Sequence, residues 1–243
     1  MRMDAGRQTL TGAIAEETGV KHLIIEIILT LVLTVFGYAF TVSKLSGQSF
    51  SALRMPHLIP RGRNRKLYLA ISLFLGIALA ASLTALYPAS GLLHHVKLLT
   101  LVMFIVPMAA IDHVRHIIPN TLILAAIAMR VVYAGLELMT DAAGALVILK
   151  SAALGAVLVG GFFLIISFVM KNSVGMGDVK LFFVMGLYQG LWGAANAVFF
   201  SLIVSFFYAV YLLLTRRKTR KDSISLAPCV LIGACIAIGL SGM

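Results

Sequence analysis

Long runs of apolar residues, separated by short polar stretches, make up most of the sequence after residue 21. A run of about 17–25 apolar residues is long enough to cross the ~30 Å hydrocarbon core of a bilayer as a helix. Because the runs are continuous and do not alternate in polarity, they do not fit the strands of a membrane β-barrel. The pattern predicts an all-α polytopic membrane bundle of about eight transmembrane helices. The predicted spans are residues 22–42, 67–87, 92–111, 117–138, 145–170, 179–191, 195–214 and 224–240.

The boundary between the sixth and seventh spans is the weakest in this pattern. Gly190, Gly193 and Asn196 are the only turn-forming residues in a long apolar stretch, and without a break there the count falls to seven. The first run is longer than the core of a signal peptide and lacks an Ala-x-Ala-like end, which indicates an uncleaved anchor after a polar tail, residues 1–21.

The composition leaves no room for a soluble domain. The chain of 243 residues is 60% hydrophobic and 12% charged, and its mean hydropathy is +1.01. With eight spans, only about 80 residues remain for loops and tails, so we expect a single integral-membrane domain over residues 1–243. Its two cysteines, Cys229 and Cys235, do not face one another on a helix, which argues against a disulfide framework or a zinc ribbon.

The net charge of +11 would suggest a nucleic-acid partner in a soluble protein, but membrane orientation explains it here. With the N-terminus outside, fourteen of the 20 Lys and Arg residues lie on the cytoplasmic side and five on the other. Residues 43–66 would form a basic cytoplasmic loop, and residues 216–221 a cluster suited to lipid headgroups. The positive-inside rule therefore supports an outside N-terminus, and with eight spans both termini lie outside; no nucleic-acid partner is expected.

Three of the nine Asp and Glu residues lie at or near a predicted membrane boundary: Glu26, Asp112 and Asp178. A carboxylate there is costly unless it is paired or hydrated, so each is a candidate functional residue. Glu26 lies about one turn inside the outer end of its span and fits a polar contact between helices. Asp112 ends the third span and Asp178 begins the sixth, and counting membrane crossings places both at similar depth on one face.

Two carboxylates within a few ångströms do not easily both ionise, so one holds a proton while the other acts as a base. Such a pair can activate water and protonate a peptide carbonyl, as in an aspartic protease. Gly175 and Gly177 let a substrate backbone approach Asp178 and permit a tight turn into its helix. Asp178 lies at a helix amino end and Asp112 near a carboxyl end, so we expect more of the negative charge on Asp178 and more of the proton on Asp112.

Three segments resemble motifs of the type IV prepilin peptidases, a family of membrane aspartic proteases. The first motif is an Asp followed seven positions later by Pro and a polar residue, the second is Gly-x-Gly-Asp-x-Lys, and the third is Ala-Pro-x-x-x-x-Gly. In this chain they are Asp112, Pro119 and Asn120; Gly175, Gly177, Asp178 and Lys180; and Ala227, Pro228 and Gly233. The resemblance covers residues 92–241, which would form the peptidase core.

This resemblance implies removal of the short basic leader from prepilins or pilin-like proteins at the cytoplasmic face of the bacterial inner membrane. The substrate would carry a basic leader followed by an apolar helix. Asp112 and Asp178 would be the catalytic pair, and the supporting residues would be Gly175, Gly177, Lys180, Pro119, Asn120 and Pro228.

Larger family members also have an N-methyltransferase activity and a Cys-x-x-Cys zinc module between the first two spans. Residues 43–66 contain no cysteine. The chain therefore resembles the shorter, peptidase-only branch, of the kind that serves Flp pili, and we expect no metal, no cofactor and no methylation.

Two other functions are compatible with membrane-edge acids. Presenilin-like proteases share Gly-x-Gly-Asp, but their first motif is Tyr-Asp and their late motif Pro-Ala-Leu, whereas here Ile111 precedes the Asp and Ala227-Pro228 reads in the reverse order. A proton-coupled transporter or a membrane scaffold would explain the acids, although proton relays usually lie nearer mid-bilayer and do not need the Gly-x-Gly setting.

Several other residues have simpler structural explanations, and for two of them the sequence allows more than one role. His113 and His116 lack a third metal ligand and fit an interfacial loop. Lys180 is either a partner of Asp178 or a positive-inside anchor, and Arg130, inside a span, can snorkel, pair or face the bundle. Three glycines are expected to allow close helix packing: Gly155, Gly160 and Gly161.

Overall fold

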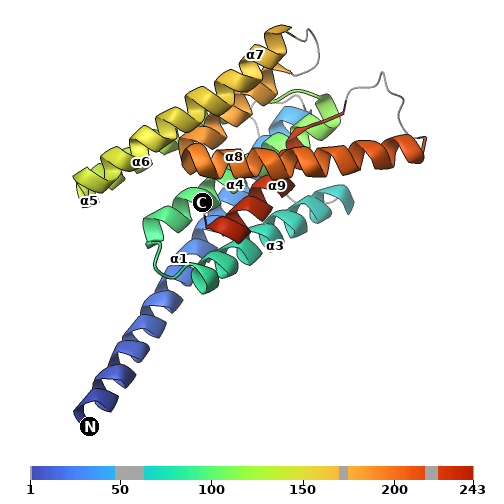
Figure 1. Ribbon diagram of the computed structural model, residues 1–243. Helices are drawn as coiled ribbons and strands as arrows, with labels where there is room; N and C mark the ends of the chain where they lie inside the picture. Colours follow the sequence, from blue (N-terminus) through green and yellow to red (C-terminus); the bar gives the residue numbers. More distant parts are fainter. Residues whose placement is uncertain (1, 47–62, 170–174, 217–223, 243) are drawn as a thin grey trace.

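The computed structural model describes residues 2–46, 63–169, 175–216 and 224–242 and shows a bundle built from helices (Figure 1). The elements are α1 (Arg2–Ser46), α3 (Arg63–Leu86), α4 (Leu92–Arg115), α5 (Asn120–Thr140), α6 (Ala142–Gly155), the π-helix η2 (Ala156–Gly160), α7 (Gly161–Val169), α8 (Met176–Leu214) and α9 (Ala227–Ser241). Segments α6, η2 and α7 follow one another without a gap, so the described residues form seven helical rods.

Six of these rods are long and apolar enough to cross a membrane by length and composition. Large apolar side chains such as Phe74, Leu124 and Phe206 are exposed on the outside of the bundle, as expected for surfaces that face lipid. The prediction of an all-α polytopic membrane bundle is therefore confirmed. The rods number seven and not eight because residues 176–214 are counted as one helix across a kink at Gly190. Only six of the seven qualify as spans because α9 has 15 residues.

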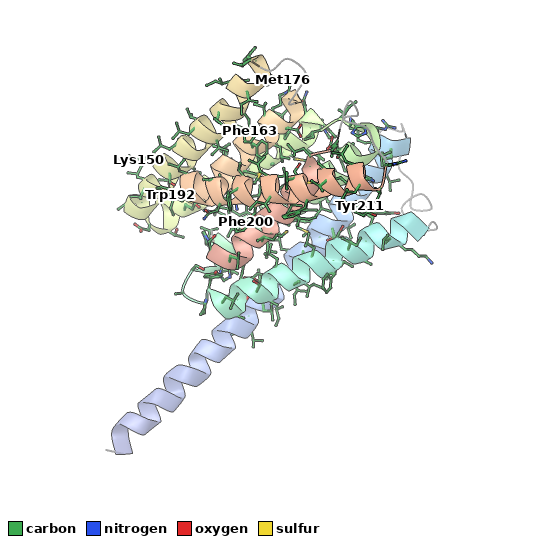
Figure 2. The ribbon with its side chains drawn as sticks, turned by 45° about the vertical axis from the view of Figure 1, so that its right-hand side comes forward. Lys150, Phe163, Met176, Trp192, Phe200 and Tyr211 are labelled. Atoms are coloured by element: carbon green, nitrogen blue, oxygen red, sulfur yellow. The ribbon has the colours of Figure 1, made fainter. Side chains whose placement is uncertain are left out.

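Helix α8 explains most of this difference. Its 39 residues would measure about 58 Å if straight, nearly twice the thickness of a hydrocarbon core. Gly190 interrupts the helix with a φ of 71°, a conformation that favours glycine, and the Ser151 hydroxyl accepts the hydrogen bond of the Leu191 N–H at 3.3 Å. In Figure 2 the first arm of α8 runs from Met176 to the break, and the second returns from Trp192 through Phe200 to Tyr211. The predicted break is confirmed: the non-helical residue Gly190 separates two helical arms within the range Met176–Leu214.

Helix α1 extends beyond the predicted first span, which agrees with the apolar part of the helix, Gly19–Leu45. The polar tail, residues 1–21, was expected only to precede the first span, but the helix begins at Arg2 and continues without interruption to Ser46. Figure 1 shows its N-terminal part extending away from the other helices. Most of the predicted basic loop, residues 43–66, lies outside the described residues, and of the basic cluster, residues 216–221, only Arg216 is described.

Helix α4 lies at the centre of the bundle. One hydrophobic cluster joins it to α5, α8 and α9, and a second joins it to α3 and α9. Its side chains Leu98, Leu101 and Ile105 are fully buried between these neighbours. The C-terminal end of α4, which carries Asp112, is therefore held by helices that come from distant parts of the sequence.

Small residues let α8 approach its neighbours closely. A Cβ atom at Gly186 would collide with the backbone of Gly155 and Ala156, and one at Gly233 of α9 would collide with Ser201 of α8. The predicted packing role of Gly155 is confirmed. Gly160 also packs closely, since its Cβ would lie 3.0 Å from that of Phe183, but a Cβ at Gly161 would meet nothing within 4 Å.

A buried ionic network joins α4, α5 and α8 and settles the position of Arg130. Glu137 accepts hydrogen bonds from Lys97 Nζ at 2.7 Å and from Arg130 Nη1 at 3.0 Å, and all three side chains are buried. Arg130 Nε donates to the Leu187 carbonyl at 2.7 Å. Arg130 thus faces the bundle interior, where a single carboxylate is shared by two cations.

Glu26 is also a buried structural group. It is 0% exposed, its Oε1 lies 2.9 Å from His95 Nδ1, and its Oε2 accepts from the Thr84 hydroxyl at 3.1 Å. The second ring nitrogen of His95 lies 3.1 Å from the Tyr87 carbonyl. These contacts fit the expected polar link between helices and connect α1 to α3 and α4.

Replacing Glu137 with Gln is expected to destabilise the protein by about 3–5 kcal/mol, because it leaves two buried cations without a carboxylate. The measurement is thermal unfolding in detergent micelles. Lys97→Met is the matched comparison: it leaves a one-to-one Arg130–Glu137 pair and should cost much less. A Glu137→Gln protein that unfolds no earlier than Lys97→Met would contradict this account of the network.

Candidate active site

Asp112 lies one turn before the end of α4 and is only 6% exposed. The helix ends just beyond it because His116 adopts a left-handed conformation, with a φ of 53°, and donates its N–H to the Asp112 carbonyl at 2.8 Å. The Asp112 side chain accepts two hydrogen bonds at Oδ2: from the Ser225 hydroxyl at 2.5 Å and from the Ala227 N–H at 3.3 Å. Both donors come from the start of α9, 113 and 115 residues away in sequence.

Asp178 lies in the first turn of α8, where Gly175 is the N-cap. The Asp178 N–H donates to the Gly175 carbonyl at 3.0 Å, and its carboxylate accepts a hydrogen bond from the Gly175 backbone. This return contact from the third helical position to the N-cap resembles a capping box. A Cβ at Gly175 would lie 3.2 Å from Asp178 Oδ2, so the glycine leaves the carboxylate uncrowded.

The two carboxylates lie within electrostatic reach of one another. Helix α8 begins against the segment that joins α4 to α5: a Cβ at Gly177 would lie 3.0 Å from Ile118 Cβ, so a side chain there would require Ile118 to shift. The structure therefore brings together the two aspartates predicted from membrane crossings, and Gly177 contributes by close packing.

The remaining predicted supporting residues lie around this contact. Lys180 Nζ donates to Asn120 Oδ1 at 2.9 Å, so the last residue of the second motif is bonded to the last residue of the first. Pro119 is the N-cap of α5, with a φ of −67°. Pro228 lies in the first turn of α9, where proline loses no helical hydrogen bond.

Neither aspartate forms an ion pair with a cation among the residues that the structure describes. Lys180 is bonded to Asn120, and Arg115 Nη2 donates to the Leu45 carbonyl at 2.9 Å. Asp112 and Asp178 are therefore not paired with these two cations within the described chain, whereas Asp178 does make a capping contact with Gly175 at the start of α8.

The described residues contain no group of three or more His, Cys, Asp and Glu side chains close enough to hold a metal ion. His113 and His116 are both exposed at the end of α4.

The expectation that Asp178 carries more of the negative charge considered only the helix ends on which the two aspartates lie. Asp112 is near the carboxyl end of α4, as predicted, but the amino end of α9 supplies it with a backbone N–H and the Ser225 hydroxyl. These donors favour a carboxylate, so the premise that Asp112 lacks such support is wrong. Sequence reasoning missed Ser225 because no spacing rule connects it to Asp112.

An apolar groove of about 690 Å³ lies beside Asp178. Helix α5 forms one wall, η2 and α7 form another, and α8 lines it with residues on both sides of the aspartate. Lys180 and Asn120 lie at its polar end, and Gly161 lies in its apolar part. The π-helix η2 places Ala156 and Gly160 along the groove, so small side chains widen it at this point.

Comparison with known proteins gives a consistent result. Residues 98–213 match the type IV leader peptidase family, a segment that includes both aspartates. A stretch of 76 residues is 33% identical to the prepilin leader peptidase/N-methyltransferase of Bacillus subtilis (strain 168); it covers 31% of this chain and 31% of that protein. No solved structure matches the chain. The segment of this chain that contains both aspartates is therefore similar to the type IV leader peptidase family.

Proposed function

We propose that this protein is a membrane aspartic endopeptidase that removes the leader peptide of prepilins or pilin-like proteins, with Asp112 and Asp178 as its catalytic pair. The proposed peptidase core is residues 92–241. The observation that carries the proposal is the pair itself: two carboxylates lie within electrostatic reach at the ends of α4 and α8, and no described cation is paired with either.

The reaction follows from placing a water molecule and a peptide bond between the two carboxyl groups. The ionised aspartate takes a proton from the water, whose oxygen attacks the carbonyl carbon, and the protonated aspartate gives its proton to the carbonyl oxygen. The resulting diol collapses when the first aspartate returns its proton to the leaving nitrogen. The second aspartate recovers its own proton from a diol hydroxyl, so the pair ends in its starting state.

The orientation of the proposed enzyme is supported by its charges. Lys44, Arg115, Lys180 and Arg216 occur at the helix ends on the side of the aspartates, whereas Lys97 on the other side is neutralised by Glu137. By the positive-inside rule the aspartates face the cytoplasm. We therefore place the protein in the bacterial inner membrane with cleavage at the cytoplasmic face.

The apolar groove supports a substrate whose scissile bond is followed by an apolar helix. Its polar end is formed by Lys180, two residues beyond Asp178, and it continues along apolar side chains such as Ile123, Leu124 and Leu164. A substrate helix in this groove would present its membrane-edge peptide bond to the aspartates. Helix contacts of this kind rely on small residues and packing, which the groove provides at Gly160 and Gly161.

Asp112→Asn and Asp178→Asn are each expected to lower the rate of leader cleavage by about three orders of magnitude or more, because each removes one of two groups that act as a unit. The measurement is the size shift of a prepilin reconstituted with the enzyme in proteoliposomes. Asp141→Asn is the matched control, since Asn retains the N-cap of α6 that Asp141 provides. Cleavage at the parental rate by either active-site variant would rule out the dyad.

Gly161→Leu is expected to raise KM for the prepilin about 10-fold with a smaller effect on kcat, because the leucine side chain would occupy part of the groove that binds the substrate helix. A Cβ at this position meets nothing within 4 Å, so the fold should tolerate the change. Gly135→Leu is the matched control. Gly135 is exposed on a helix whereas Gly161 is half-buried, but a Cβ at either position meets nothing within 4 Å, and Gly135 does not line the groove. Equal KM values for the two variants would show that the substrate helix binds elsewhere.

A further inference from the structure

We propose that Ser225 is a positioning residue that, together with the Ala227 N–H, holds Asp112 as the ionised base of the pair and leaves Asp178 as the acid. This inference rests on the proposed function and adds to it a residue outside the three motifs. It also assigns a direction to the proton transfers.

The contacts of Asp112 are concentrated on one oxygen. Ser225 Oγ and the Ala227 N–H both donate to Oδ2, at 2.5 Å and 3.3 Å, and Oδ1 has no hydrogen-bond partner among the described side chains and backbone groups. Two donors on one oxygen fix the plane of the carboxylate. Oδ1 is therefore the atom available to take a proton from water.

The donors also favour the charged form of Asp112. Hydrogen bonds to an ionised acceptor are stronger than those to a neutral one, and the Ala227 N–H belongs to the first turn of α9, whose amino end attracts negative charge. Asp112 and Ser225 are both buried, so water does not replace these bonds. A buried carboxylate with two donors and no described cation depends on those donors for its stabilisation.

Asp178 also lies at a helix amino end, in the first turn of α8, but it accepts fewer hydrogen bonds than Asp112. Its carboxylate accepts from the Gly175 backbone, and no other described side chain donates to it. With Asp112 ionised within electrostatic reach, a second charge at Asp178 is disfavoured. Asp178 therefore holds the proton that passes to the substrate carbonyl oxygen.

Each proton has a defined place in this assignment. Asp112 Oδ1 removes a proton from water while Asp178 protonates the carbonyl oxygen, and a C–O bond forms to give a diol. The C–N bond then breaks as Asp112 transfers its proton to the leaving nitrogen and Asp178 takes one from a diol hydroxyl. The products are a carboxylic acid and an amine, and Ser225 keeps its own proton throughout.

Ser225→Ala is expected to lower kcat for prepilin cleavage by about 10-fold or more, with KM little changed, because the groove is not altered. Ser225→Thr retains the hydroxyl and should restore most of the rate. Ser241→Ala, at the other end of α9, removes a hydroxyl bonded within its own helix and serves as the matched control with parental kcat. If Ser225→Ala does not accumulate, Ser225→Cys, a weaker donor, should show an intermediate loss of kcat.

The pH profile of kcat/KM tests the assignment of base and acid. Losing a donor makes Asp112 harder to ionise, so in Ser225→Ala the acidic limb should move to higher pH if Asp112 is the base. Movement of the alkaline limb alone would identify Asp112 as the acid and overturn the assignment. The other ionisable groups at the neighbouring helix ends are unchanged in this variant: His113, Arg115 and His116 of α4, Asp178 and Lys180 of α8, and Lys44 of α1.

A parental kcat for Ser225→Ala or Ser225→Cys, or an equal loss for Ser225→Thr and Ser225→Ala, would refute the positioning role. The Asp112→Asn and Asp178→Asn proteins separate this result from a failure of the proposed function. If they are inactive and Ser225→Ala is normal, only the inference about Ser225 fails. If they still cleave, the aspartic mechanism itself is wrong.

Discussion

The close approach of α8 to the segment between α4 and α5 determines the whole candidate site. Gly177 allows this approach because even one methyl group there would press on Ile118. The Lys180–Asn120 hydrogen bond holds the same two segments from the exposed side. Since Asp112 ends α4 and Asp178 begins α8, this single contact brings two carboxylates together that are far apart in the chain. The spacing of the second motif fits this contact: Gly177 lies at the contact, Asp178 follows it, and Lys180 lies at the exposed rim.

The site needs a third helix end as well. Helix α9 presents its first-turn N–H and the preceding Ser225 hydroxyl to Asp112, and its position depends on its packing against α8. Gly233 allows that packing because a side chain there would collide with Ser201. The late Ala-Pro-x-x-x-x-Gly segment thus has two structural roles. Its start places a helix amino end at Asp112, and its glycine sets the distance between α9 and α8.

The apolar lengths and the membrane-edge acids were predictable from the sequence because both follow from the cost of placing polar groups in hydrocarbon. Counting crossings therefore placed Asp112 and Asp178 on one face, and turn chemistry located the break at Gly190. The hydrogen-bond and ion-pair partners of the buried polar side chains were not predictable from the sequence. Arg130 had three plausible environments, and only the packed bundle shows that it shares Glu137 with Lys97. Ser225 was missed for the same reason, since a contact across 113 residues leaves no periodic signal.

The carboxylates at the two ends of the bundle have different kinds of hydrogen-bond partners. Away from the aspartates, Glu137 is bonded to two cations and Glu26 to a histidine and a threonine, so each negative charge is matched and those helices are fixed in place. At the aspartates, the nearby cations Lys180 and Arg115 are bonded to an amide and a carbonyl. A strong ion pair would hold an aspartate ionised and unreactive, whereas neutral donors orient it and leave its proton exchangeable. The neutral donors at this end therefore suit the proton-transferring role proposed for Asp112 and Asp178.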